Sequence, residues 1–183
     1  IRDRRKRWPF TGGLDENIPN RFLNVPLPSQ CNDTEFMFVF EKLVLPLLDR
    51  FQPEALIIQG GADALVEDPM SRLCLSNQVI FKILSILLGF SQRVLLTGGG
   101  GYNPWTVARL WTGFWALISG RTIPEVLPNQ ATELLRSLSW QRQTKPKEIM
   151  LNSIYDVPME GQLRDEVRDI VKKVSSLHKF KHS

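Results

Sequence analysis

The 183-residue sequence is short of the side chains on which most self-contained catalytic sites depend. It contains two histidines, His178 and His182, and both lie in the final six residues. No GxSxG string is present, so nothing indicates a serine nucleophile activated by a histidine. Because three or four ligands must converge to form a zinc site, the scarcity of histidine also argues against a complete zinc site within this chain.

Cysteine and long apolar runs are scarce as well. The two cysteines, Cys31 and Cys74, do not form a CxxC pair. They indicate neither a disulfide framework nor a zinc knuckle, and they favour a reducing cytoplasm as the location. The longest apolar run, residues 79–90, is interrupted by Lys82 and Ser85. Such a run is too short and too polar to cross a bilayer, so we expect no membrane partner.

Phosphate-binding and nucleic-acid motifs are also missing. No Walker string occurs, and the third glycine of a GxGxxG fingerprint starting at Gly98 would fall on Asn103. A helix beginning after Asn103 can still attract an anion, which keeps anion binding as a minor alternative. Basic residues gather in segments 1–7 and 172–183. Since no aromatic residues or known nucleic-acid motif accompany them, we interpret both segments as solvated surface and expect no nucleic-acid partner.

The periodicity of the sequence predicts strands and helices that alternate. Strands are predicted at residues 21–27, 54–59 and 93–97, and helices at residues 32–51, 76–90 and 103–120. This order is typical of an α/β domain with an open, mainly parallel sheet and flanking helices. The last two strands have the composition of strands buried on both faces. Pro46 predicts a kink or break in the first helix.

We interpret residues 1–183 as a single domain in which residues 121–183 form a loop-rich extension. This extension contains a short helix at residues 131–140 and a C-terminal helix near residues 162–180. The C-terminal helix is predicted to dock through one apolar face, formed by Val167, Ile170, Val171, Val174 and Leu177.

Two of the predicted strands end in glycine-rich segments. GGAD follows residues 54–59 and delivers Asp63, while GGGGY follows residues 93–97 and delivers Tyr102. Ligands bind at the carboxyl ends of strands in parallel α/β sheets, and glycine allows a close approach of backbone and ligand. Asp63 is either a metal ligand or a structural residue that caps a helix or forms a turn. Tyr102 is either a hydroxyl donor to a polarised carbonyl or a packed aromatic, and the residues alone leave both questions open.

The strings LIIQGGADALVEDPMSRLCLS and VLLTGGGGYNPWTVARLWT together resemble the zinc-dependent histone deacetylase superfamily. They are most similar to its bacterial branch, the acetoin-utilisation-type deacetylases, and the resemblance covers residues 8–161. It implies the arginase–deacetylase fold. It also implies hydrolysis of an acyl amide on a lysine or a polyamine, with Zn²⁺ as cofactor and Fe²⁺ as the alternative.

The resemblance also implies roles for individual residues. Asp63 corresponds to a zinc ligand, and Tyr102 to the donor of a hydrogen bond to the substrate carbonyl. Met70 and Trp8 correspond to residues that line the acyl-lysine tunnel. The glycine run, including Gly100 and Gly101, would leave room for the stem of the substrate.

The sequence departs from the family at two motifs. A DxH string and a pair of adjacent histidines, which complete the family's site, are both absent. We therefore expect this chain to be the carboxyl-terminal half of a longer deacetylase, whose missing N-terminal half is its partner. By itself it should be inactive, and its uncovered apolar faces should promote homo-oligomers or aggregates. The alternative is a catalytically inactive interaction module that retains the deacetylase half-fold.

Overall fold

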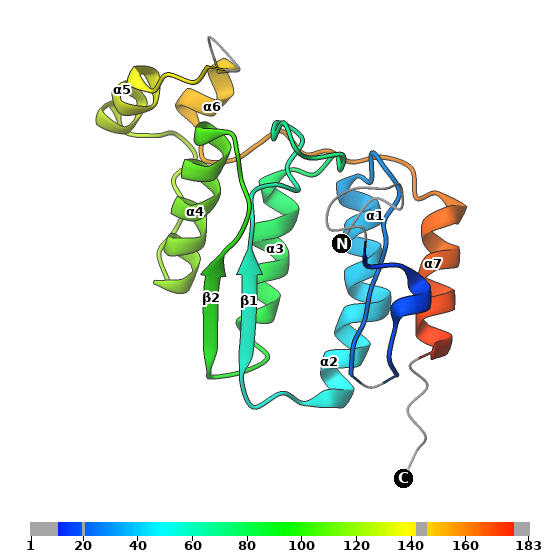
Figure 1. The fold of residues 1–183 in the computed structure, drawn as a ribbon. Coiled ribbons are helices and arrows are strands. Elements are labelled where there is room, and N and C mark those ends of the chain that lie inside the picture. The colour runs from blue at the N-terminus through cyan, green and yellow to red at the C-terminus, as the bar shows by residue number, and fades with distance from the viewer. Residues whose placement is uncertain (1–10, 20, 142–145, 178–183) are drawn as a thin grey trace.

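The protein is an α/β fold in which two parallel strands are flanked by helices (Figure 1), as the sequence predicts. The structure, a computed structural model, describes residues 11–19, 21–141 and 146–177. In chain order the elements are η1 (Leu14–Glu16), α1 (Asp33–Val39), η2 (Phe40–Val44), α2 (Leu45–Phe51), β1 (Leu56–Gly60), α3 (Asn77–Leu87), β2 (Val94–Gly98), α4 (Pro104–Ile118), α5 (Asn129–Ser137), α6 (Glu148–Asn152) and α7 (Asp165–Leu177).

Strands β1 and β2 form a parallel pair that is connected through α3. Their register runs from Leu56 opposite Val94 to Gly60 opposite Gly98. Parallel neighbours need a crossover, and a helix is the usual solution. Because the two strands point the same way, the glycine-rich segments that follow them leave the sheet at the same edge (Figure 1).

The sheet is covered on one face and open on the other. Ile58 and Leu96 pack into the core. Ile57 and Leu95 occupy the opposite face and are 76% and 56% exposed. The prediction that these strands are buried on both faces is therefore wrong. Their apolar composition suits a strand buried on both sides, but nothing in the described part of the chain covers the second side.

The first predicted helix runs without interruption from Asp33 to Phe51, but its hydrogen-bond pattern changes near Pro46. Asn32 begins α1 with the predicted capping box: its Oδ1 accepts the Glu35 amide at 3.0 Å, and Glu35 Oε2 accepts the Asn32 amide at 3.2 Å. The five residues of η2 then form a π-helical turn that ends at Val44, two residues before Pro46. Since proline has no N–H to donate to the preceding turn, the helix loosens there and continues as α2.

The predicted strand at residues 21–27 is wrong. Phe22 forms only an isolated antiparallel bridge with Ile18, and residues 23–28 adopt no regular structure. Pro26 and Pro28 cannot donate ladder hydrogen bonds. The apolar end of the run, residues 25–27, is buried in the core, and Leu27 is buried completely.

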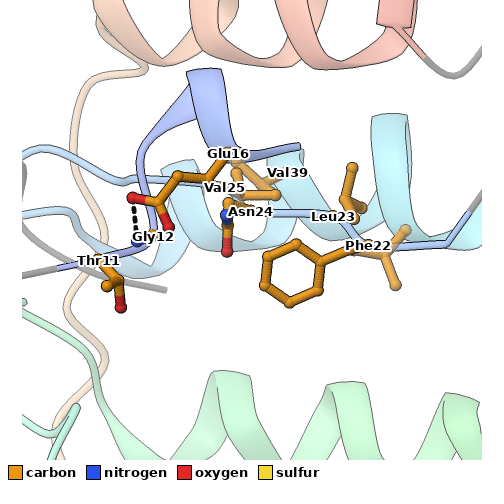
Figure 2. Close-up of a pocket in the computed structure, with 9 residues that line it drawn as sticks. Thr11, Gly12, Glu16, Phe22, Leu23, Asn24, Val25 and Val39 are labelled. Atoms are coloured by element: carbon orange, nitrogen blue, oxygen red, sulfur yellow. Dashed lines mark hydrogen bonds between the residues drawn. The ribbon is translucent and has the colours of Figure 1, made fainter. Parts of the chain in front are cut away.

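A cavity of about 430 Å³ lies beside this segment. Its wall includes Phe22, Val25 and Val39, together with the carboxylate of Glu16 (Figure 2). That carboxylate accepts the amide of Gly12 at 3.0 Å. The Glu16 carboxylate therefore stabilises the neighbouring backbone, and most of the other residues in the wall are apolar.

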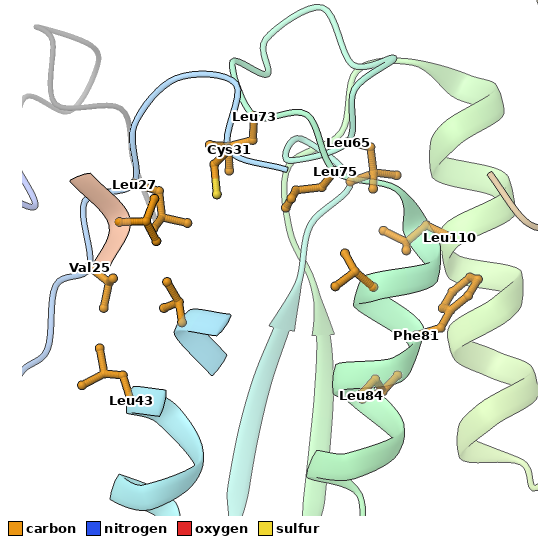
Figure 3. Close-up of a cluster of buried hydrophobic side chains, with 14 of the residues drawn as sticks. Val25, Leu27, Cys31, Leu43, Leu65, Leu73, Leu75, Phe81, Leu84 and Leu110 are labelled. Carbon is orange, nitrogen blue, oxygen red and sulfur yellow. The ribbon is translucent and has the colours of Figure 1, made fainter. Parts of the chain in front are cut away.

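The main hydrophobic core joins the irregular segment to the helices and the sheet (Figure 3). Leu27, Cys31 and Leu75 all belong to it, and Phe81 of α3 contacts Phe114 of α4 edge to face at 6.0 Å. The core thus fixes α3 and α4 against one another behind the sheet. No helix among the described residues is long and apolar enough to span a bilayer.

The C-terminal part returns to the body of the fold. Helix α7 buries Val167, Ile170, Val171 and Val174, whereas Leu177 is 44% exposed. Just before α7, the Arg164 guanidinium donates two hydrogen bonds of 2.6 Å to the Glu35 carboxylate. Arg109, buried in α4, forms an ion pair with Asp156 at 2.7 Å. These bonds tie residues 153–164 to α1 and α4.

Candidate functional site

The two glycine-rich loops that follow β1 and β2 touch through their backbones. The amide of Ala62 donates to the carbonyl of Gly100 at 2.7 Å. A Cβ atom on Gly99 would lie 2.7 Å from the Cα atom of Gly61, a distance that real side chains do not tolerate. Glycine at these positions therefore allows the loops to come together.

Asp63 lies on the first loop with an exposed side chain. Its carboxylate rests against Gly100, where any side chain would overlap it. No described residue forms a hydrogen bond or an ion pair with this carboxylate. Asp63 is thus accessible as an oxygen ligand, and none of the described residues uses its carboxylate to stabilise the fold.

Tyr102 lies on the second loop and is 54% exposed. It follows Gly101, whose φ of 150° lies in a region that favours glycine. None of the described residues forms a hydrogen bond with its hydroxyl. The structure therefore places Tyr102 two residues from the glycine against which Asp63 rests, on the same edge of the sheet.

Met70 is the third predicted residue near these loops, and it is 52% exposed. Its amide donates to Asp68 Oδ1 at 2.9 Å, and the amide of Tyr102 donates to Asp68 Oδ2 at 2.6 Å. Met70 and Tyr102 are therefore held by a common carboxylate. Trp8, the remaining predicted tunnel residue, lies outside the described residues.

Asp68 is a member of this site that our sequence interpretation did not single out. It is 3% exposed and lies between Asp63 and Met70 in the chain. The signal that could have found it is the Asp–Pro dipeptide it forms with Pro69, a pair that favours turns.

The predicted helix cap at Asn103 is confirmed. Its Oδ1 accepts the amide of Trp105 at 3.0 Å, and its Nδ2 donates to the carbonyl of Glu67 at 2.9 Å. Asn103 is completely buried. The start of α4 is therefore fastened to the loop that carries Asp63.

The described residues do not make up a complete metal site. No group of three or more histidine, cysteine, aspartate or glutamate side chains converges within residues 11–19, 21–141 and 146–177. Asp63 suits zinc or ferrous iron as one oxygen ligand, but a tightly held ion needs several. Any further ligands must come from residues outside this part of the chain.

Neither cysteine is suited to nucleophilic chemistry. Burial, with a smaller contribution from the Glu35 charge, raises the pKa of the Cys31 thiol to about 12. Burial also raises the pKa of Cys74, and the charge of Asp33 adds to that effect. Since the thiolate is the reactive form, both thiols are unreactive near neutral pH.

Comparisons with known proteins agree with the resemblance seen in the two motifs. A family model for the histone deacetylase domain matches residues 2–118. Histone deacetylase 8 of Xenopus tropicalis is 36% identical over 107 residues, which are 58% of this chain and 29% of that protein. Histone deacetylase clr6 of Schizosaccharomyces pombe is 33% identical over 125 residues, or 66% of this chain and 31% of that protein.

Two solved structures are similar along nearly the whole chain. The crystal structure of an HDAC homolog from Aquifex aeolicus is 37% identical, with a TM-score of 0.83. A crystal structure of an HDAC homolog complexed with SAHA is 36% identical, with the same TM-score. Each match covers 94% of this chain and 48% of the other, so the chain spans about half the length of these homologs. The chain belongs to the histone deacetylase family.

Proposed function

We propose that this chain is the carboxyl-terminal part of a metal-dependent deacetylase that hydrolyses an acetyl amide on a lysine or a polyamine. The observation that carries the proposal is the presence, on adjoining loops, of two polar groups to which no described residue forms a hydrogen bond. The Asp63 carboxylate and the exposed Tyr102 side chain follow neighbouring parallel strands, and Asp63 rests against Gly100. Because the chain belongs to the histone deacetylase family, we propose that this carboxylate and this tyrosine serve deacetylation.

Each residue has a defined part in the proposed chemistry. Asp63 would be one ligand of Zn²⁺, or of Fe²⁺. The bound ion supplies an activated water and polarises the substrate carbonyl. Tyr102 would donate its hydroxyl proton in a hydrogen bond to that carbonyl and stabilise the oxyanion that develops there. Met70, Gly100, Gly101 and Trp8 would line the path of the substrate stem.

The rest of the site would come from the other half of the fold. Three observations support this: the chain covers 48% of its solved homologs, the described residues supply no set of three metal ligands, and they leave one face of the sheet uncovered. We therefore propose that this chain alone is inactive. Assignment to the acetoin-utilisation branch and to the cytoplasm stays a prediction.

An inactive interaction module with the same half-fold is the competing proposal. It keeps Asp63 and Tyr102 but has no source of further ligands or of a general base. The complete gene product decides between the two. A DxH string and a histidine pair encoded upstream support the enzyme, and their absence supports the module.

The proposal is tested by metal content and acetate release in the full-length protein, meaning the longer deacetylase to which we assign this chain. We expect removal of the metal with a chelator to abolish acetate release from acetyl-lysine or acetylpolyamine, and zinc or ferrous iron to restore it. Asp63→Asn should lower both the bound metal and turnover, because the amide loses the charge that holds the cation. Asp49→Asn, which changes an exposed aspartate on α2, should alter neither.

Two results would contradict the proposal. A wild-type protein that binds the metal but releases no acetate from either substrate class would favour the interaction module. Full metal content and turnover in Asp63→Asn would remove Asp63 from the ligand set, even if the enzyme is active.

A further inference from the structure

The Asp68 carboxylate lies between the two loops of the proposed site and is almost fully buried, at 3% exposure. Each of its oxygens accepts a backbone amide: Oδ1 that of Met70 at 2.9 Å, and Oδ2 that of Tyr102 at 2.6 Å. A buried charge is costly unless it is hydrogen-bonded, and bonds to an ionised acceptor are the stronger kind. Asp68 therefore couples the backbone positions of two residues with proposed roles at the substrate.

Tyr102 depends on such bonds because of what precedes it. Gly98 to Gly101 have no side chains that could anchor the loop by packing. Glycine also has the greatest conformational freedom to lose on folding. The loop is held instead by hydrogen bonds: the Gly100 carbonyl accepts the amide of Ala62, and the Asn103 side chain donates to the Glu67 carbonyl. The bond from the Tyr102 amide to Asp68 lies between these two and acts on the tyrosine itself.

We propose that Asp68 is a positioning residue that sets the place of the Tyr102 hydroxyl relative to the reacting carbonyl, and of Met70 beside the substrate. This inference rests on the proposed function. Misplacement of a reacting group by about 1 Å can cost roughly 100-fold in rate. Loss of the Asp68 bonds should therefore act mainly on kcat, because the exposed tyrosine remains present but is no longer held in place.

The fold offers a matched control in Asp33. This buried aspartate, 7% exposed, also accepts two backbone amides, from Ser76 and Met159, each at 2.8 Å. The Ser76 hydroxyl donates to it as well, at 2.6 Å. Ser76 precedes α3, as the sequence predicts, but its hydroxyl donates to Asp33 and forms no capping bond with the helix. Asp33→Asn therefore removes a buried, amide-bonded carboxylate that does not hold Met70 or Tyr102.

The test compares Asp68→Asn with Asp33→Asn in the full-length protein. We expect both to lower the melting temperature, while only Asp68→Asn lowers kcat, by roughly 10- to 100-fold, with a smaller change in KM. In a Tyr102→Phe background the further effect of Asp68→Asn on kcat should largely vanish, since the hydroxyl through which Asp68 acts is gone. Asp68→Glu, which keeps the charge, should restore part of the lost rate.

A second readout does not depend on activity. Hydrogen exchange of the Tyr102 amide should be faster in Asp68→Asn than in wild type, and unchanged in Asp33→Asn. Unchanged exchange at Tyr102, or equal kcat losses in the two variants, would overturn the inference. If the wild type has no deacetylase activity, the proposed function fails, and exchange at Tyr102 still decides whether Asp68 holds this loop. If Asp68→Asn does not fold, the test passes to Asp68→Glu. The Tyr102 amide must then exchange faster in Asp68→Glu than in wild type.

Discussion

The acidic residues at the start of α1 and Asp63, on the loop after β1, are used in opposite ways. Asp33 and Glu35 are buried, and their carboxylates accept bonds from residues as distant in the chain as Met159 and Arg164. Asp63 is exposed and bonds no described residue. The first region uses its charges to close the fold, whereas the second keeps a charge available. That difference, more than the glycine motif itself, is why we propose the loops after β1 and β2 as the functional end of the sheet.

Asp68 shows how the available groups are supported. It is buried and bonded like Asp33, yet the groups it holds belong to Met70 and Tyr102. The site therefore consists of exposed side chains on a backbone that a buried carboxylate fixes. Such an arrangement meets the requirement that reacting groups be held in place while their functional atoms stay accessible.

Among the acidic residues at the start of α1, Glu35→Gln should have the largest effect on stability. Burial opposes ionisation of Glu35, but bonds from the Arg164 side chain and amide and from the Asn32 amide outweigh it and lower the pKa of Glu35. Replacing it should cost about 2 kcal/mol in the free energy of unfolding at pH 7, the range for hydrogen bonds to charged groups. Glu41→Gln, at an exposed position in η2, is the control and should cost almost nothing.

The effect of Glu35 should also depend on pH. Because its pKa is lower in the folded protein, its contribution is complete above the pKa of an unfolded glutamate, about 4.3. It is lost as the pH falls through the lowered, folded value. The wild-type advantage over Glu35→Gln should therefore shrink in acid when the two are unfolded with urea. An advantage that grows in acid would contradict the assigned role.

A smaller effect is expected at the open face of the sheet. If Ile57 and Leu95 lack a cover, residues 1–183 expressed alone should self-associate through them. Ile57→Lys should weaken that association about tenfold, since burial of one such side chain contributes roughly 1.5 kcal/mol or more. Sedimentation equilibrium measures it. Val126→Lys, at a 72% exposed position in the loop before α5, should have no effect, and a monomeric wild-type chain would contradict the prediction.

Local signals in the sequence located most helices and both strands. Asn32 and Asn103 define helix starts through side-chain bonds over two or three residues, so their chemistry is visible in a short stretch. The failures involve distant partners. Residues 25–27 are buried by a core built from distant parts of the chain, and the burial of Ile57 depends on whatever covers the sheet.

The candidate site was predictable in part for the same reason. Strand ends and glycine runs are local features, and they led to Asp63 and Tyr102. Asp68 was missed because its bond to the Tyr102 amide spans 34 residues, a distance over which composition and spacing carry no information. Its burial became visible only once the two loops were seen in contact.

The central claim is that the Tyr102 hydroxyl acts on the substrate, and the chain contains a matched control for it. Its other tyrosine, Tyr155, is half-buried and contacts Phe81 edge to face at 6.1 Å. The most direct measurement is kcat for acetate release by full-length Tyr102→Phe and Tyr155→Phe, which lose the same hydroxyl group. The account predicts a loss of roughly 10²- to 10³-fold for Tyr102→Phe, the scale of one oxyanion donor, and a nearly unchanged rate for Tyr155→Phe. Equal rates in the two variants would contradict it.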